Sequence, residues 1–159
     1  MYTFSRQDQA ELLAEARDRT DTEGFMKDAW ALGVYLTETE ELCAIAVFQN
    51  ITTAGAEVHF AGVQSGWNNS RVMRSLYRYA FDPKMMAYPM LTAIIPEHRT
   101  DVQIFALKNG FRFDGRRRAG AKNGFEVVIM TMTPDECRLL PPSTPVELVL
   151  DEENFAKGA

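Results

Sequence analysis

The chain has 159 residues, of which 46% are hydrophobic, and a formal net charge of −5; these values predict one folded domain and exclude a disordered chain or a general nucleic-acid-binding protein. The N-terminal sequence MYTFSRQDQAEL lacks the basic start and apolar core of a signal peptide, and no apolar run is long enough to cross a bilayer. Two cysteines, Cys43 and Cys137, without a CxxC motif make neither a disulfide framework nor a zinc site, so we expect buried thiols in a cytoplasmic protein with no metal, membrane or nucleic-acid partner.

The first predicted element is a helix from about Gln7 to Arg17, which Ser5 is placed to cap. The polar segment from Asp21 to Asp28 fits either a second short helix or a loop. The apolar stripe of the first helix would consist of Leu12, Leu13 and Ala16.

Three strands are predicted next, at Trp30 to Leu36, Leu42 to Phe48 and Ala56 to Val63, with turns at 37–41 and 50–55. The middle strand is apolar on both faces, as expected for a strand covered on both sides. In the third strand, polar Glu57 and His59 share one face and the apolar residues at 58 and 60 share the other.

The second half alternates helices and strands. An amphipathic helix is predicted at Ser70 to Phe81, with a core face of Val72, Met73, Leu76, Tyr77 and Ala80. The later elements are a strand at 89–95, a helix at 100–109 ended by Gly110, and a strand pair at 111–117 and 125–132 joined by a glycine-containing turn. This order predicts an α/β fold with a mixed sheet, which occupies residues 1–140.

From Pro141 the composition changes to proline, serine and acidic residues. We expect residues 141–159 to form an extended tail, or else an added edge strand for this sheet or a neighbour's, because Val146, Leu148 and Leu150 alternate.

The segment Val58 to Phe81 joins a strand to a helix through a short turn of glycine, asparagine and serine. A helix N-terminus presents unpaired N–H groups and a partial positive charge, so this order predicts an anion-binding turn.

From Trp30 to Leu140 the chain resembles the GCN5-related N-acetyltransferase (GNAT) superfamily. The run TAIIPEHRTDVQIFALKNGFRFDGRRR looks like the family's strand, loop, helix and GF-x-x-(E/D)-G-x-x-R motif. The end, EVVIMTMTPDECRLL, is similar to the M-x-x-x-E-C end of small phage-associated members. The matching residues are Gly110, Phe111, Asp114, Gly115 and Arg118 for the first motif, and Met132, Glu136 and Cys137 for the second.

The resemblance implies a mostly antiparallel sheet in which acetyl-CoA, the cosubstrate, lies between two splayed parallel strands. Its pantetheine arm would follow Phe60, Ala61, Gly62 and Val63. Its pyrophosphate would lie at the turn and helix formed by Gln64, Gly66, Asn68, Asn69, Ser70, Arg71 and Arg74. The two arginines also fit a solvated helix face.

Three positions depart from the family's pattern. Trp67 and Asn69 stand where the phosphate turn has small residues, so either Gly66 approaches the pyrophosphate in a shifted register or the turn no longer binds CoA. Ala106 stands where many members carry the tyrosine that protonates the CoA thiolate, and it cannot donate a proton.

The candidate general bases are Glu57 and His59, because the amine must lose a proton to attack the thioester. The pair equally fits a simple hydrogen-bonded contact in which the carboxylate keeps the histidine charged. His98 is interpreted as an exposed loop residue. The basic run 116–118 fits a contact to the CoA 3′-phosphate, a contact to an acidic partner, or a solvated strand end.

Two functions follow. The first is an acetyl-CoA-dependent N-acyltransferase that acts on an amine of a small molecule or peptide. The second is a GNAT-fold binding or assembly module without catalysis, which the missing glycines and tyrosine favour. A homodimer is compatible with both.

Overall fold

The computed structural model describes residues 1–20, 22–120 and 124–140. Within these residues no helix is both long and apolar enough to span a membrane. The elements in chain order are β1 (Tyr2–Ser5), α1 (Gln9–Arg19), β2 (Trp30–Leu36), β3 (Leu42–Thr52), β4 (Gly55–Gly62), α2 (Ser70–Phe81), β5 (Leu91–Pro96), α3 (Thr100–Asn109), β6 (Arg112–Arg117), β7 (Val127–Met132) and the short 3₁₀ helix η2 (Pro134–Glu136).

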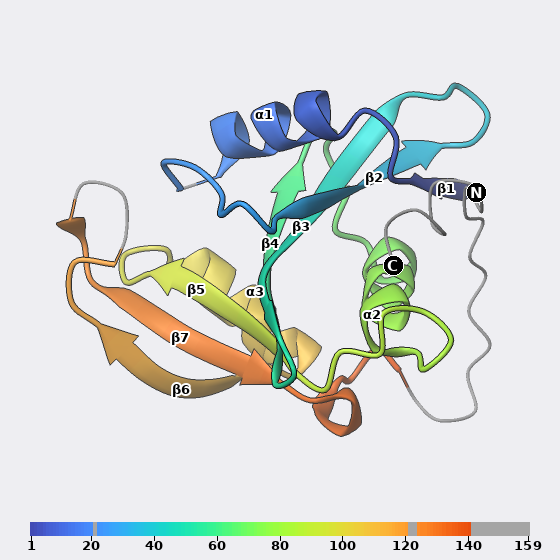
Figure 1. The fold of residues 1–159 in the computed structure, drawn as a ribbon. Coiled ribbons are helices and arrows are strands. Elements are labelled where there is room, and N and C mark those ends of the chain that lie inside the picture. Colours follow the sequence, from blue (N-terminus) through green and yellow to red (C-terminus); the bar gives the residue numbers. More distant parts are fainter. Residues whose placement is uncertain (21, 121–123, 141–159) are drawn as a thin grey trace.

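The strands form one mixed sheet in the order β1-β2-β3-β4-β5-β7-β6. All neighbouring strands are antiparallel except β4 and β5, which are parallel. Figure 1 shows these two strands starting side by side and then diverging, so that the sheet opens into a V between its two halves. The predicted mostly antiparallel sheet with one splayed parallel pair is confirmed.

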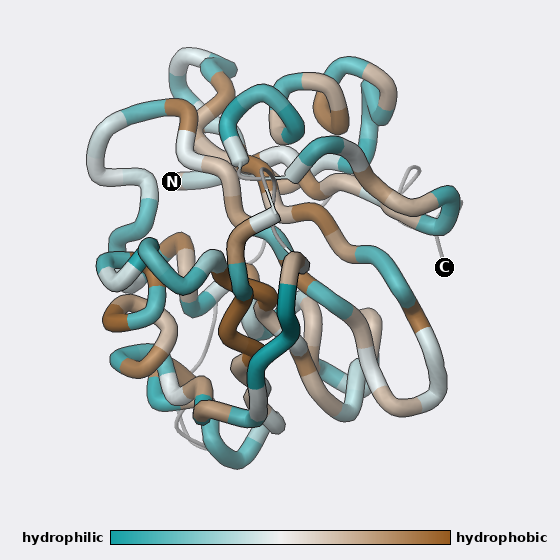
Figure 2. The backbone as a smooth tube through the Cα atoms, turned by 90° about the vertical axis from the view of Figure 1, so that its left-hand side faces the viewer, coloured by the Kyte–Doolittle hydropathy of each residue, from teal (hydrophilic) through white to brown (hydrophobic). Residues whose placement is uncertain are grey.

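Helices cover both faces of the sheet. On one face Leu12 and Ala16 of α1 pack against Ile45, Val47 and Ala61 of β3 and β4. On the other face α2 contributes to a larger core that also contains residues of β2, β5, α3 and β7. In Figure 2 the hydrophobic positions gather along the inner segments of the chain and the hydrophilic ones along outer turns. Since β3 is covered on both sides, its residues 43–49 are all buried.

The helix α2 has the predicted bounds because both ends are encoded locally. Asn69 caps its N-terminus by accepting a hydrogen bond from the Val72 N–H at 3.0 Å. Its predicted core face is buried throughout. The predicted helix at 100–109 also agrees with α3, which ends at Gly110 in the left-handed conformation (φ 117°).

The N-terminal region corrects two predictions. The first residues form β1, an edge strand that pairs with β2, and α1 begins at Gln9 rather than Gln7. Ser5 does not cap the helix, because it belongs to β1 and its Oγ accepts a hydrogen bond from the Gln7 N–H instead. The segment from Thr22 to Asp28 is a loop.

The turn predicted at 50–55 is shorter than expected, since β3 continues to Thr52 and β4 begins at Gly55. Both cysteines are buried and unpaired, as predicted. The predicted tail at 141–159 lies outside the described residues.

Candidate active site

The divergence of β4 and β5 creates the site. Their parallel pairing is limited to Ala56↔Leu91 and Glu57↔Thr92. Beyond this point β4 continues to Gly62 along β3, whereas β5 continues to Pro96 along β7. The two strands therefore share one short junction and then separate, as Figure 1 shows.

The separation leaves one edge of β4 without a strand partner. The Ala56 N–H donates to the carbonyl of Met90 at 3.1 Å, which fixes the side that faces β5. Because strand residues alternate, the N–H groups of Val58, Phe60 and Gly62 point the same way. These backbone groups form a row of donors and acceptors along the V, of the kind that an extended ligand can pair with.

A cavity of about 930 Å³ fills the V. It is lined by the end of α1 and the loop that follows it, by β4, β5 and α3, and by the segment around the turn between β6 and β7. Among the predicted site residues, the cavity contacts Glu57, His59, Phe60, Gly62 and Asn68. It also contacts Arg19, which the sequence did not single out and whose Nη1 donates to the Gly62 carbonyl at 3.4 Å.

The remaining predicted residues lie around the cavity rather than in its lining. Ala61 and Val63 belong to the core under α1, on the opposite face of β4 from Phe60. Gln64 is tied to β3 by its N–H, which donates to the Cys43 carbonyl at 3.1 Å. Gly66, Ser70 and Arg71 are exposed on the turn and the first turn of α2.

Arg74 contacts the C-terminal part of the domain, since its Nε donates to the carbonyl of Leu139 at 3.1 Å. The contact of Arg74 with the CoA pyrophosphate stays a prediction from the sequence.

The turn before α2 is organised around Gly66 and Asn69. Gly66 adopts the left-handed conformation (φ 75°), and space is open where its side chain would be. Asn69 is extended, and its Nδ2 donates to the Tyr2 hydroxyl at 3.0 Å and to the Gly66 carbonyl at 3.1 Å. The left-handed residue of this turn is therefore Gly66 and not Asn69.

Trp67 lies inside the V. A methyl group added to Gly62 would overlap the indole Nε1, so the ring lies directly against the backbone of β4. The same indole packs between Phe60 of β4 and Phe105 of α3, and its ring centroid lies 6.4 Å from the centroid of each phenyl ring. The ring thus covers the face of β4 at Gly62, next to the path of any ligand arm that follows this strand.

A buried glutamine joins the two candidate bases. Gln49 of β3 is 7% exposed, and its Nε2 lies 3.2 Å from Glu57 Oε2 and 3.2 Å from His59 Nε2. The other oxygen of Glu57 accepts a hydrogen bond from Asn50 Nδ2 at 3.1 Å. Glu57 and His59 therefore do share a face of β4, as predicted, but they meet through Gln49.

Burial lowers the pKa of His59, and the nearby Glu57 carboxylate opposes this effect only in part. The expectation that the carboxylate keeps His59 charged is wrong, because the loss of solvation outweighs the attraction. The sequence reasoning missed Gln49, although a glutamine at the end of the apolar run AIAVFQ was a visible signal.

Ala106 stands at the position where the resemblance to the GNAT superfamily places a tyrosine. Ala106 is buried and lines the cavity, as does Tyr77 of α2. The Tyr77 hydroxyl accepts a hydrogen bond from Asn109 Nδ2 at 2.6 Å, and burial raises its pKa. Tyr77 is interpreted as a core residue, in agreement with the sequence analysis.

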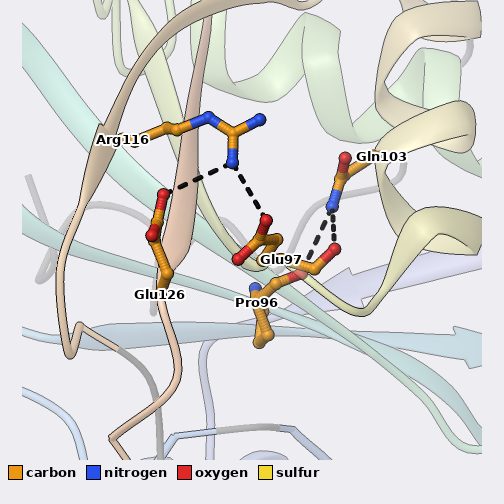
Figure 3. Close-up of polar contacts among 5 residues, drawn as sticks. All are labelled: Pro96, Glu97, Gln103, Arg116 and Glu126. Atoms are coloured by element: carbon orange, nitrogen blue, oxygen red, sulfur yellow. Dashed lines mark hydrogen bonds and ion pairs between the residues drawn. The ribbon is translucent and has the colours of Figure 1, made fainter.

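Exposed ion pairs lie just beyond the end of β5, next to Pro96, which lines the cavity. Arg116 Nη1 lies 3.1 Å from Glu97 Oε1 and 3.3 Å from Glu126 Oε1, as drawn in Figure 3. In the same view Gln103 Nε2 donates to the carbonyls of Pro96 and Glu97, at 3.3 and 2.9 Å. The first arginine of the basic run thus pairs within the protein. His98 is exposed and packs on Phe125, with ring centroids 4.9 Å apart.

No protein-family model and no curated protein sequence matches this chain. Solved structures do match it. A point mutant of the spermidine N-acetyltransferase SpeG from Vibrio cholerae has a TM-score of 0.70 at 11% identity and covers 90% of this chain and 98% of its own. A protein named as a phosphinothricin N-acetyltransferase has a TM-score of 0.63 at 15% identity and covers 84% of this chain and 98% of its own. With its splayed β4 and β5 and its helices on both faces, the chain has the fold of the GNAT acetyltransferases.

Proposed function

We propose that this chain is an acetyl-CoA-dependent N-acetyltransferase that transfers an acetyl group to an amine. The observation that carries the proposal is the unpaired edge of β4, which opens into a cavity of about 930 Å³ with a glutamate at its base. The solved structures with the same fold include enzymes named for the acetylation of amines.

The unpaired edge of β4 supports binding of the pantetheine arm of the cosubstrate. The N–H groups of Val58 and Phe60 face the V and would hold an extended pantetheine arm. Trp67 covers the face of Gly62, so the arm would pass this indole to reach the start of α2. When bound, acetyl-CoA supplies a thioester whose carbonyl carbon accepts the amine.

Glu57 would act as the general base. Its carboxylate lines the cavity and has acceptor sites left after its bonds to Gln49 and Asn50. The amine nitrogen forms a bond to the acyl carbon, the bond from that carbon to sulfur breaks, and the amine proton goes to Glu57. With Ala106 in place of a tyrosine, water would protonate the departing thiolate.

The test is thermal unfolding with and without acetyl-CoA. A ligand present at about a thousand times its Kd stabilises the folded state by about 4 kcal/mol, which gives a clear rise in Tm. We expect this rise in the wild type and a larger one in Trp67→Gly, which clears the path along Gly62. Trp67→Phe is the matched control, because it keeps a ring in the V.

A rise in Tm would be followed by an assay of thiol release, with spermidine and phosphinothricin as the first amines. We expect Glu57→Gln to lower turnover by about 10²-fold or more while the Tm rise with acetyl-CoA is kept. Equal turnover in the wild type and Glu57→Gln would reject Glu57 as the base.

The position of Trp67 favours a second function, a GNAT-fold binding or assembly module without acetyl transfer. An indole packed against the face of β4 narrows the path that the arm of a cosubstrate would follow. No Tm rise at millimolar acetyl-CoA in the wild type, with a rise in Trp67→Gly, would support the module and reject the enzyme. The cytoplasmic location, the homodimer and the likeness to phage-associated members stay predictions from the sequence.

A further inference from the structure

The amide of Gln49 has only one orientation that satisfies its contacts. Its Oε1 accepts a hydrogen bond from the backbone N–H of Met26 at 2.7 Å. A backbone N–H can only donate, so the oxygen must face Met26 and the nitrogen must face Glu57 and His59.

This orientation determines where the proton of His59 lies. The amide nitrogen has two protons to donate, one toward Glu57 Oε2 and one toward His59 Nε2. The distance from Gln49 Nε2 to each of these atoms is 3.2 Å. His59 Nε2 must then be the acceptor, so a neutral His59 carries its proton on Nδ1. An imidazolium would place an N–H against the amide N–H, and burial disfavours its charge as well.

The other nitrogen of His59, Nδ1, has no hydrogen-bond partner among the described residues. His59 lines the cavity. Phe25 packs edge-on against the ring, with centroids 5.5 Å apart, and so limits its rotation. A neutral His59 in this cavity lining therefore carries a donor on Nδ1 and not a lone pair.

We propose that Gln49 is a positioning residue that holds His59 as a neutral Nδ1–H donor and leaves Glu57 as the proton acceptor of the site. The catalytic part of this proposal rests on the proposed N-acetyltransferase function. In the acyl transfer the amine proton goes to Glu57, and His59 keeps its proton throughout. A substrate atom that contacts His59 must then be a hydrogen-bond acceptor, such as a carbonyl, carboxylate or hydroxyl oxygen.

The tautomer can be measured without any ligand, so this test stands even if the chain proves not to be an enzyme. The chain has two histidines, His59 and His98, and long-range ¹H–¹⁵N NMR correlations distinguish Nδ1–H from Nε2–H imidazole. At neutral pH we expect His59 as the Nδ1–H tautomer, while exposed His98 shows the averaged signals of an imidazole in exchange.

The variant Gln49→Glu tests whether the amide of Gln49 determines the tautomer of His59. A carboxylate at this position can only accept, so we expect His59 to move its proton to Nε2 or to become charged, with a raised pKa. Gln103→Glu is the matched control, because Gln103 bonds to backbone carbonyls near α3 and should leave His59 unchanged. An Nε2–H tautomer in the wild type, or an unchanged His59 in Gln49→Glu, would overturn the proposal.

If acetyl transfer is detected, two variants of His59 extend the test. Asparagine keeps an N–H donor near the position of Nδ1, whereas leucine has none. We expect His59→Asn to retain at least about tenfold more turnover than His59→Leu, a difference within the range of one hydrogen bond. Equal and complete loss in both folded variants would identify His59 as the base and reject the proposal.

Discussion

The bond between Tyr77 and Asn109 shows how one pair of polar atoms joins α2 to α3. Both residues are buried, with exposed fractions of 1% and 5%. The hydroxyl of Tyr77 accepts from Asn109 Nδ2 at 2.6 Å. Because both side chains are almost fully buried, each partner depends mainly on the other for its hydrogen bond.

We expect Tyr77→Phe to lower the free energy of unfolding by about 1–3 kcal/mol, because Asn109 is left buried with one bond fewer. Urea unfolding measures the loss. Tyr2→Phe is the control and should cost less, since Asn69 Nδ2 keeps the Gly66 carbonyl when the Tyr2 hydroxyl is removed. Equal losses in the two variants would contradict this interpretation.

His59 should make stability depend on pH. Burial lowers its pKa in the folded state below the unfolded value of about 6.5. The unfolded chain therefore binds a proton first as the pH falls, so the stabilisation is complete above about pH 6.5 and is lost as the pH falls toward the folded pKa. We expect the free energy of unfolding of His59→Asn to fall less than that of the wild type between about pH 7 and pH 5. If the free energies of unfolding of the two proteins changed with pH in parallel, the pKa of His59 would not be lowered in the folded state.

At the residue scale, the sequence predicted which residues share a strand face but did not predict the contacts that depend on tertiary structure. Glu57 and His59 were predicted to share a strand face because alternation in a strand is a local rule. Gln49 was missed because its role depends on strand register, which places Gln49 opposite Glu57. The location of Trp67 against Gly62 depends on a turn conformation that residue types alone do not determine.

At the scale of elements, the hairpin between β3 and β4 limits where the sheet can open. Gly55 has a φ of 141°, and a methyl group there would overlap the Met90 carbonyl. That carbonyl also accepts the Ala56 N–H at 3.1 Å, the bond that starts the parallel pairing. A glycine is therefore required at the point from which β4 and β5 diverge.

We expect Gly55→Ala to destabilise the fold by more than Gly66→Ala, as measured by the shift in urea midpoint. Both glycines have a positive φ, which costs about 1–2 kcal/mol for alanine, but Gly66 has open space where a side chain would lie. The difference between the two variants reports the overlap with Met90 together with the greater backbone strain at φ 141°. If both cost the same, the close approach at Gly55 is unimportant.

Elements with local signals at both ends were predicted well. The bounds of α2 follow from its cap, its apolar stripe and the proline after Asp82. In contrast, β1 was missed because a four-residue strand has little pattern of its own and exists through its pairing with β2. The same pairing explains why Ser5 extends a strand and does not begin a helix.

At the scale of the whole molecule, the larger core connects the two halves of the sheet. Residues of β2 and β3 belong to the same buried cluster as residues of β5, α3 and β7. Trp30 lies in the first half of this core and stacks on Phe48, with ring centroids 4.7 Å apart. Trp67 lies in the V and packs against Phe105 of α3. A shared core is expected to unfold as one unit.

We therefore expect far-ultraviolet circular dichroism and tryptophan fluorescence to report the same urea midpoint. Trp67→Phe, in which Trp30 alone reports, serves as the control for local changes at the V. A fluorescence transition well before the loss of secondary structure, present in both proteins, would show that the halves unfold separately.

The short junction of β4 and β5 has a consequence for the order of the chain. Every strand of one half-sheet, β1 to β4, precedes every strand of the other, β5 to β7. Among the described strands the chain passes from one half to the other between β4 and β5, through α2 and the segment that follows it, and Figure 1 shows α2 to the right of β4. The protein is thus divisible by a single cut after Asp82 into two contiguous fragments, whose reassembly through the shared core would rebuild the cavity from two polypeptides.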